Sequence, residues 1–444
     1  MVLPLMCELF CWATARNVAD VEAHNQPSAP GIAKAESPAV QLLGNSDFRR
    51  VWIAGALVGT MRWLDTLAVG VYVLNVTNSP FQVALILFLR TIPMFLFGVV
   101  AGAITEKVDR RTLLLSVVGA LALTYVVLTM LTITGNLEIW HLGVGVFILG
   151  VYFAIELPTR RTMIADIAGL DRIGPAMGLE STTTNFTRMI GPFAGGILFE
   201  FFDIVGTQAL GGLLYGISFF LIVSAGYTKR APKPDAEKRS IAADIAEGLK
   251  FVAHHRVVLA TLLITVNSNI FAYSYITMVP AIAKQVMGLS AFPTGLLMTA
   301  EGFGAVMGAT AVAFVSKPPR FNQVYFFGAL LYLVSIFIFA ASHNFWIALP
   351  VICIGGLGGA CFGSMQSTLI VSNTPIEMRS RIMGVLAMAI GAQPIGVLCV
   401  GWLSEQFGPA YGLMATSGAG IATMAAAALL WPEMTKRRET SPAA

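Results

Sequence analysis

Charged residues are scarce in this chain, at only 12% of its 444 residues, whereas an ordinary soluble domain carries roughly 25%. Hydrophobic residues account for 56%. A water-soluble protein of this composition could not cover its surface with polar groups, so the composition excludes an ordinary soluble fold. The apolar residues gather in runs of about 20 or more, which is the length that a helix needs to cross a bilayer.

Cysteine and histidine are equally sparse, with five residues of each. The cysteines have neither paired nor metal-like spacing, so we expect no disulfide framework and no metal site. The glycine-rich run 355–359 lacks the lysine of a phosphate-binding loop and lies in an apolar segment, where packing explains it. No nucleophile–base pair is visible, so the sequence does not favour an enzyme, a cofactor or a nucleic-acid partner.

Twelve apolar stretches are long enough to cross a membrane as helices. Lipid offers no hydrogen-bond partner to the backbone, so each stretch must satisfy its own amides and be helical. The predicted fold is therefore an all-α polytopic membrane protein with twelve transmembrane helices. The stretches are residues 51–74, 81–104, 112–134, 139–157, 176–200, 207–227, 257–283, 292–315, 323–341, 345–370, 382–403 and 409–431.

The positions of the basic residues predict the orientation of these spans. Of the 28 Lys and Arg residues, three lie inside spans and only Lys284 lies in a loop on one side. The remaining 24 lie in loops and tails on the opposite side. Because cytoplasmic loops are enriched in Lys and Arg, we expect an inner (plasma) membrane protein with both termini in the cytoplasm.

The longest hydrophilic stretch between spans divides six spans from six. Each half repeats one spacing at its fifth span, where Gly178 precedes Gly195 by 17 residues and Gly384 precedes Gly401 by 17. The repeat predicts two pseudo-symmetric six-helix bundles. The expected parts are a flexible cytoplasmic tail (1–47), the first bundle (48–228), a cytoplasmic linker with an amphipathic helix at the membrane interface (229–256), the second bundle (257–433) and a cytoplasmic tail (434–444).

The first 47 residues are left out of the predicted fold. Residues 1–12 are apolar but too short to span, and they lack the basic start of a signal peptide. A misassigned start codon explains them better than a targeting role.

The loop between the second and third spans carries a motif formed by Gly102, Glu106, Lys107, Asp109, Arg110 and Arg111. It resembles the signature loop of the major facilitator superfamily, Gly-x-Leu-Ala-Asp-Arg-x-Gly-Arg-Arg/Lys, with Glu for the usual Asp and Asp for the second Gly. The resemblance implies that Glu106 pairs with the partly positive start of span 11, beside Arg379 and Arg381, and latches the cytoplasmic side. Asp109 would have to accept the backbone conformation of a glycine. An ordinary positive-inside loop is the alternative.

Span 5 carries a second motif, formed by Gly178, Thr187, Gly191, Pro192, Gly195 and Gly196. It resembles the Gly-x8-Gly-x3-Gly-Pro-x2-Gly-Gly pattern of antiporters in the same superfamily, with Thr187 replacing one glycine. Small residues let helices approach closely, and the proline bends the span. The resemblance places span 5 against Gly302, Gly304 and Gly308 of span 8 and favours export over uptake. Generic glycine packing is the alternative.

Three weaker matches are similar to the bacterial efflux branch that includes siderophore exporters. They are Tyr72, Thr77 and Ser79 after span 1, Glu247-Gly248-Leu249 before span 7, and Arg379-x-Arg381 before span 11.

Ionisable side chains inside the spans are candidates for a functional role, since placing each at the centre of a bilayer costs at least about 2.5–3.5 kcal/mol. Asp65 and Glu301 are the candidates for binding a coupling proton. Arg62, three residues before Asp65, either neutralises it or leaves it to titrate. Arg90 and Arg188 are candidates for binding an anionic substrate group or for pairing with Asp65 across helices.

Two further carboxylates, Glu156 and Glu180, lie near the cytoplasmic ends of their spans, where we expect them at the interface. By family resemblance, spans 1, 4, 7 and 10 line one central cavity.

The sequence thus predicts a monomeric secondary transporter in a lipid bilayer. Its predicted activity is export of a small amphipathic molecule, such as a drug-like compound or a siderophore, in exchange for protons. An uptake carrier for a metabolite or metal complex would share the topology and differ in direction. A non-transporting sensor on the same fold is the less favoured alternative.

Overall fold

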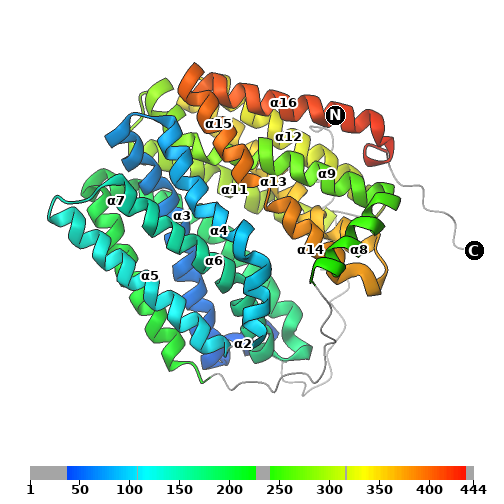
Figure 1. Ribbon diagram of the computed structural model, residues 1–444, viewed down its shortest axis with the longest axis horizontal. Helices are drawn as coiled ribbons and strands as arrows, with labels where there is room; N and C mark the ends of the chain where they lie inside the picture. The colour runs from blue at the N-terminus through cyan, green and yellow to red at the C-terminus, as the bar shows by residue number, and fades with distance from the viewer. Residues whose placement is uncertain (1–37, 108, 227–240, 316–317, 437–444) are drawn as a thin grey trace, which may run out of the picture.

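The computed structural model of the chain describes residues 38–107, 109–226, 241–315 and 318–436. The fold is all-α, as predicted, and no strand occurs in this part of the chain. Helices α2 to α7 gather on one side of the molecule and α8 to α16 on the other (Figure 1). The helices are α2 (Pro38–Gly44), α3 (Ser46–Thr77), α4 (Pro80–Lys107), α5 (Arg110–Ile133), α6 (Ile139–Ala168), α7 (Ile173–Ser224), α8 (Ile241–His254), α9 (Arg256–Phe271), α10 (Val279–Ala281), α11 (Ala291–Val315), α12 (Phe321–Ala341), α13 (Phe345–Ser372), α14 (Arg379–Ile390), α15 (Gln393–Phe407) and α16 (Pro409–Leu430).

Within the described residues, ten helical segments are long and apolar enough to cross a membrane by length and composition. Within the described residues, all twelve predicted stretches lie in helical segments or in short breaks beside them, and residue 227 of the sixth stretch lies outside the described part. The second stretch lies in α4. Helix α7 has 52 residues and contains the fifth stretch and most of the sixth. The two are separated by a break at Asp203, whose φ of 53° and ψ of −158° lie outside the helical region.

Two predicted spans are not continuous helices, and this corrects the sequence analysis. The stretch 257–283 consists of α9, a 3-10 segment Tyr273–Thr277 and the short α10, followed by a π-helical turn Ile282–Val286. The stretch 382–403 is split between α14 and α15. Pro394 stands in the first turn of α15, where its missing N–H costs nothing, but the same residue would interrupt a continuous helix.

Packing divides the helices into two groups that meet along two seams. In the first group α3 and α5 pack on α7, and α4 packs on α6; in the second, α13 packs on α11 and α12, and α16 on α12 and α15. The seams between the groups are α7 against α11 and α4 against α15. Large apolar side chains remain exposed on outer faces, including Phe220 (70%), Trp346 (76%) and Leu429 (84%). Such faces suit lipid rather than water.

The seam between α7 and α11 depends on glycine. A Cβ atom on Gly302 would lie 2.9 Å from the Met189 Cα, and one on Gly295 would lie 2.6 Å from the Pro192 carbonyl oxygen. From the α7 side, a Cβ atom on Gly196 would lie 3.1 Å from the Phe292 Cα. Only residues without a side chain allow these two backbones to approach so closely.

The predicted roles of the other glycines need correction. Gly304 and Gly308 face α13 and not α7, whereas Gly191 and Gly195 face α3. No heavy atom lies within 4 Å of a Cβ built on Gly178, so this residue makes no close helix contact among the described residues.

Candidate functional site

Two adjoining chambers lie at the meeting of the two groups and share part of their lining. The basic chamber, of about 240 Å³, is lined chiefly by α3, α4, α6 and α7 and includes Arg62, Phe153 and Arg160. The tyrosine chamber, of about 310 Å³, is lined from both groups and includes Tyr273 and Tyr332. Arg62, Trp63, Arg90, Thr91, Ile390 and Gln393 line both chambers. Spans 1, 4, 7 and 10 all contribute, together with residues of spans 2, 5, 9 and 11.

Asp65 lies buried on α3 and faces α4. Its Oδ2 lies 3.6 Å from the Arg90 Nη1, and neither of these two buried atoms makes a hydrogen bond. Arg90 donates instead through Nη2 to the backbone carbonyl of Arg62, at 2.6 Å. Asp65 therefore pairs with an arginine of the neighbouring helix through one long contact, and its carboxylate also interacts with the Tyr125 side chain of α5. The suggested neutralisation of Asp65 by Arg62 is not what the structure shows.

Glu301 and Arg188 form a tighter pair across the seam between α7 and α11. The Arg188 Nε donates to Glu301 Oε2 at 3.0 Å, and Nη2 donates to Oε1, which gives a two-point contact. The Glu301 side chain is 2% exposed and that of Arg188 18%. The Arg188 guanidinium also lies over the Trp63 ring, 5.3 Å from its centroid. This pair joins the two groups of helices in the interior.

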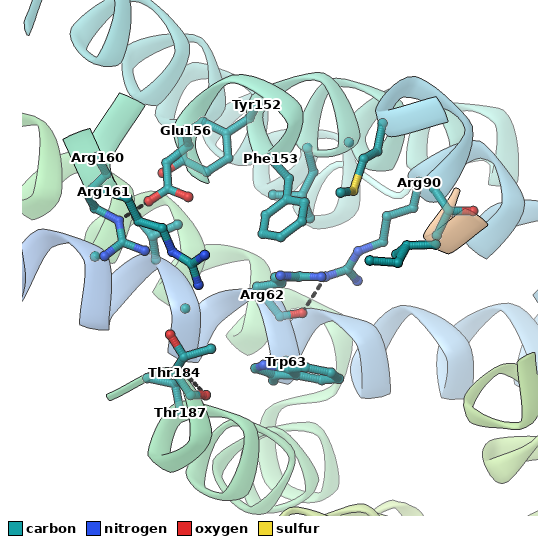
Figure 2. Close-up of a pocket in the computed structure, with 18 of the residues that line it drawn as sticks. Arg62, Trp63, Arg90, Tyr152, Phe153, Glu156, Arg160, Arg161, Thr184 and Thr187 are labelled. Carbon is teal, nitrogen blue, oxygen red and sulfur yellow. Dashed lines mark hydrogen bonds and ion pairs between the residues drawn. The ribbon is translucent and has the colours of Figure 1, made fainter. Parts of the chain in front are cut away.

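Arg62 lies at the junction of the two chambers, and Figure 2 shows it between Phe153 and Trp63. Its guanidinium carbon is 3.5 Å from the centroid of the Phe153 ring and 5.4 Å from that of Trp63. Among the described residues Arg62 has no ion-pair partner, in contrast to Arg90 and Arg188. It is therefore a cation that rests on aromatic faces and opens onto the cavity.

Sequence reasoning missed a buried cluster at one end of the basic chamber. Arg160 pairs with Glu156, one turn earlier on α6, and its Nη1 lies 2.5 Å from the Glu180 Oε1 on α7. Glu156 is 3% exposed and Glu180 2%, so both are buried in the bundle rather than placed at an interface as expected. The spacing of four residues between Glu156 and Arg160 was the available signal.

The wall that the second group contributes to the tyrosine chamber was also missed, because its side chains are neutral. Gln366 donates to the Thr265 hydroxyl at 3.0 Å, and Gln393 donates to the Tyr273 carbonyl at 3.4 Å. Tyr273 lies in the 3-10 break after α9, and Gln393 begins α15 after the break in span 11. Irregular backbone at membrane depth is tolerated where it lines a cavity, so the two breaks mark this wall of the site.

Half of the predicted gating loop can be placed. Asp109 caps α5 by accepting from the Thr112 N–H at 2.9 Å, and its φ of −60° is extended backbone, so no glycine-like conformation is needed here. Arg110 pairs with Asp166 at 2.6 Å, and Arg111 donates to the Val223 carbonyl. Gly102, Glu106 and Lys107 have side chains outside the described residues.

The weak motifs before spans 7 and 11 meet in space. Glu247 on α8 lies 2.6 Å from the Arg381 Nη1 on α14, and a Cβ atom on Gly248 would lie 3.2 Å from Val385. Arg379 donates to the Thr374 carbonyl at 3.2 Å. The amphipathic α8 thus packs against α14, and its place is set by protein contacts as well as by its apolar face.

The two groups are also tied at the end that carries Lys284. Glu405 of α15 accepts from the Ser79 hydroxyl at 2.8 Å and from the Phe81 N–H at 3.2 Å, and so caps the start of α4. Lys284 donates to the Asn75 side chain at 2.6 Å. Glu200 accepts from the Phe292 N–H at 3.2 Å. These contacts hold α3, α4 and α7 to the second group at one end of the cavity.

Comparison with known proteins gives a consistent result. Residues 38–442 match a family model described as transmembrane secretion effector. The chain is 21% identical to the staphyloferrin A transporter of Staphylococcus aureus, over 78% of this chain and 86% of that protein. It is 24% identical to the enterobactin exporter EntS of Salmonella paratyphi A, over 89% of this chain and 94% of that protein.

Solved structures share the fold at low identity. An inward-facing, unoccupied bacterial homologue of the human lysosomal transporter Spinster superposes with a TM-score of 0.69 at 15% identity, over 89% of this chain and 99% of that chain. The nucleoside transporter NupG gives a TM-score of 0.70 at 11% identity, over 87% of this chain and 99% of that chain. At these identities the similarity concerns the fold alone.

Proposed function

Because the chain belongs to the transmembrane secretion effector family of major facilitator superfamily transporters, we propose that it exports a small amphipathic molecule in exchange for protons. The proposed substrate is a siderophore or a drug-like compound, since related proteins are named as a staphyloferrin A transporter and an enterobactin exporter. The protein is a multi-pass membrane transporter. We further propose that it is a monomer in the inner membrane with both termini in the cytoplasm, and the positive-inside rule supports this orientation.

The proposal depends above all on the contact between Arg90, which lines both chambers, and Asp65, which is buried behind it. A single ion pair at 3.6 Å, without a hydrogen bond between its two atoms, separates easily when the carboxylate takes up a proton. Protonation would then release Arg90 and change the charge of both chambers, since Arg90 lines both. Alternating binding of proton and substrate at linked sites is the minimum that antiport requires.

Asp65 is preferred over Glu301 as the proton-binding group. Glu301 is held at two points by Arg188, so protonating it would cost two charge-assisted hydrogen bonds. We assign the Arg188–Glu301 pair a different role, as a tie between α7 and α11 in this conformation. The close glycine contacts of the same seam would seal the interior, and the loop of Glu106 with Arg379 and Arg381 would gate the cytoplasmic side.

The test uses purified protein reconstituted in proteoliposomes with an imposed pH gradient and an enterobactin or staphyloferrin A probe. Asp65→Asn should abolish proton-driven accumulation and substrate-induced proton movement while leaving downhill exchange measurable. The control is Asp171→Asn, which alters an exposed carboxylate outside the cavity and should transport like the wild type.

Two results would count against the proposal. Proton-coupled accumulation in Asp65→Asn at the rate of the wild type would remove Asp65 from the coupling. Accumulation inside right-side-out vesicles, with none in inside-out vesicles, would show the uptake carrier instead.

A further inference from the structure

We infer that the substrate is an organic anion with an aromatic or other flat apolar body, and that Arg62 is the residue that selects its charge. The inference rests on the proposed transport function and narrows its substrate class. The observation behind it is the contrast between Arg62 and the other arginines in the interior. Arg90 faces Asp65, Arg188 faces Glu301, and Arg160 faces two glutamates.

The charges around Arg62 leave it uncompensated. The charged side chains that act on it are Arg90 and Arg188, which repel it, and Glu156, which attracts it but is itself bound to Arg160. A cation in the interior without a partner is unfavourable, because removal from water is not offset by an ion pair. A bound anion at the junction of the two chambers would supply the missing charge.

Arg161, a second cation of the basic chamber, also supports an anionic ligand. Arg161 is exposed to the cavity, has no ion-pair partner among the described residues, and lines the basic chamber. Figure 2 shows its guanidinium directed toward the same space as that of Arg62. The two acidic groups of this chamber share Arg160, which leaves that cluster with one negative charge. Arg62, Arg90 and Arg161 line the same chamber, so the field that a ligand meets is positive on balance.

The aromatic surroundings define the rest of the ligand. Phe153 lies against one face of the Arg62 guanidinium. The N–H groups of the guanidinium point outward in its own plane, so this contact leaves them free to donate. A carboxylate or catecholate fits this edge with two parallel hydrogen bonds. Trp63, Tyr152 and Phe95 line the same chamber, so its wall is rich in aromatic residues and suits a flat apolar group. With about 240 and 310 Å³, the adjoining chambers suit a ligand of drug-like size.

The experiment measures binding of two xanthene dyes of similar shape and opposite charge, carboxyfluorescein and rhodamine 6G, to the purified protein by fluorescence anisotropy. Arg62→Gln should weaken binding of the anionic dye by about tenfold or more, the range expected for a lost hydrogen bond to a charged group. Arg62→Lys should bind the anionic dye with an affinity between those of the wild type and Arg62→Gln, because lysine keeps the charge but lacks the planar guanidinium that donates two parallel hydrogen bonds. Binding of rhodamine 6G should not weaken. Arg320→Gln, an exposed arginine outside the cavity, is the charge-matched control.

Equal binding of the anionic dye by Arg62→Gln and Arg320→Gln would overturn the inference. A wild-type protein that binds rhodamine 6G in preference to carboxyfluorescein, or that shows no saturable binding of the anion, would also overturn it. Proton-coupled export of a cation or a neutral compound would contradict the substrate class and leave the transport function standing. Membrane yield and thermal unfolding of each variant show whether a loss of binding reflects a loss of folded protein.

Discussion

Removing either partner of the Arg188–Glu301 pair should destabilise this conformation, and the loss should be larger for Arg188 than for Glu301. Glu301→Gln leaves a buried guanidinium without a carboxylate, a change that typically costs about 3–5 kcal/mol. Arg188 is 18% exposed toward the cavity and keeps the Trp63 ring as a cation–π partner, so the cost should lie near about 3 kcal/mol. A loss of that size changes the population of a conformation by about a hundredfold.

Arg188→Gln should be the more damaging single change. It leaves the Glu301 carboxylate, 2% exposed, with no cation and little access to water, so the cost should approach about 5 kcal/mol. The double variant Arg188→Gln/Glu301→Gln contains neither charge and should be more stable than Arg188→Gln alone.

The assay is unfolding in detergent by heat and by increasing dodecyl sulfate, followed by tryptophan fluorescence for the wild type and all three variants. The expected order of stability is wild type, then Glu301→Gln, then Arg188→Gln, with the double variant above Arg188→Gln. If the double variant lost the sum of the two single losses, the residues would not interact and the tie between α7 and α11 would be refuted.

Two further predictions concern helix packing and the end of the cavity near Lys284. Gly304→Ala should destabilise the protein by about 1–3 kcal/mol, because the added Cβ meets the Cys353 backbone carbonyl. Gly178→Ala meets nothing within 4 Å and should stabilise the helix by up to about 1 kcal/mol in the same unfolding assay. A neutral Gly304→Ala would show that α11 and α13 can move apart. Glu405→Ala removes the acceptor for the Ser79 hydroxyl and the Phe81 N–H, and losing this cap should cost about 1 kcal/mol. A single cysteine placed at Thr277, which lines the tyrosine chamber, should then react with a thiol reagent about fivefold faster, since about 1 kcal/mol corresponds to that factor. The exposed Glu377→Ala is the control, and equal labelling in the two variants would show that Glu405 does not hold this end closed.

The charge pairs show where local spacing misled the interpretation. Arg62 and Asp65 are three residues apart, so a mutual ion pair was a reasonable expectation. Side chains at this spacing still differ in direction by about 60° around the helix. This difference lets Arg62 contact Phe153 of α6 while Asp65 faces Arg90 of α4. Glu301 was recognised as a candidate, but its partner lies 113 residues away in the chain, and no local pattern identifies Arg188 as that partner.

By itself the sequence determined that most of this chain is helical and surrounded by lipid, because scarce charge and long apolar runs leave the backbone no other way to satisfy its amides. It also identified Asp65, Glu301 and the three interior arginines, because a charge in an apolar run is conspicuous. Only the tertiary structure decided which of these charges form ion pairs, and that Arg62 has no ion-pair partner among the described residues. It also decided that two spans break beside the cavity. Both outcomes depend on how the helices are rotated against each other, and that rotation is fixed by packing between residues far apart in the chain.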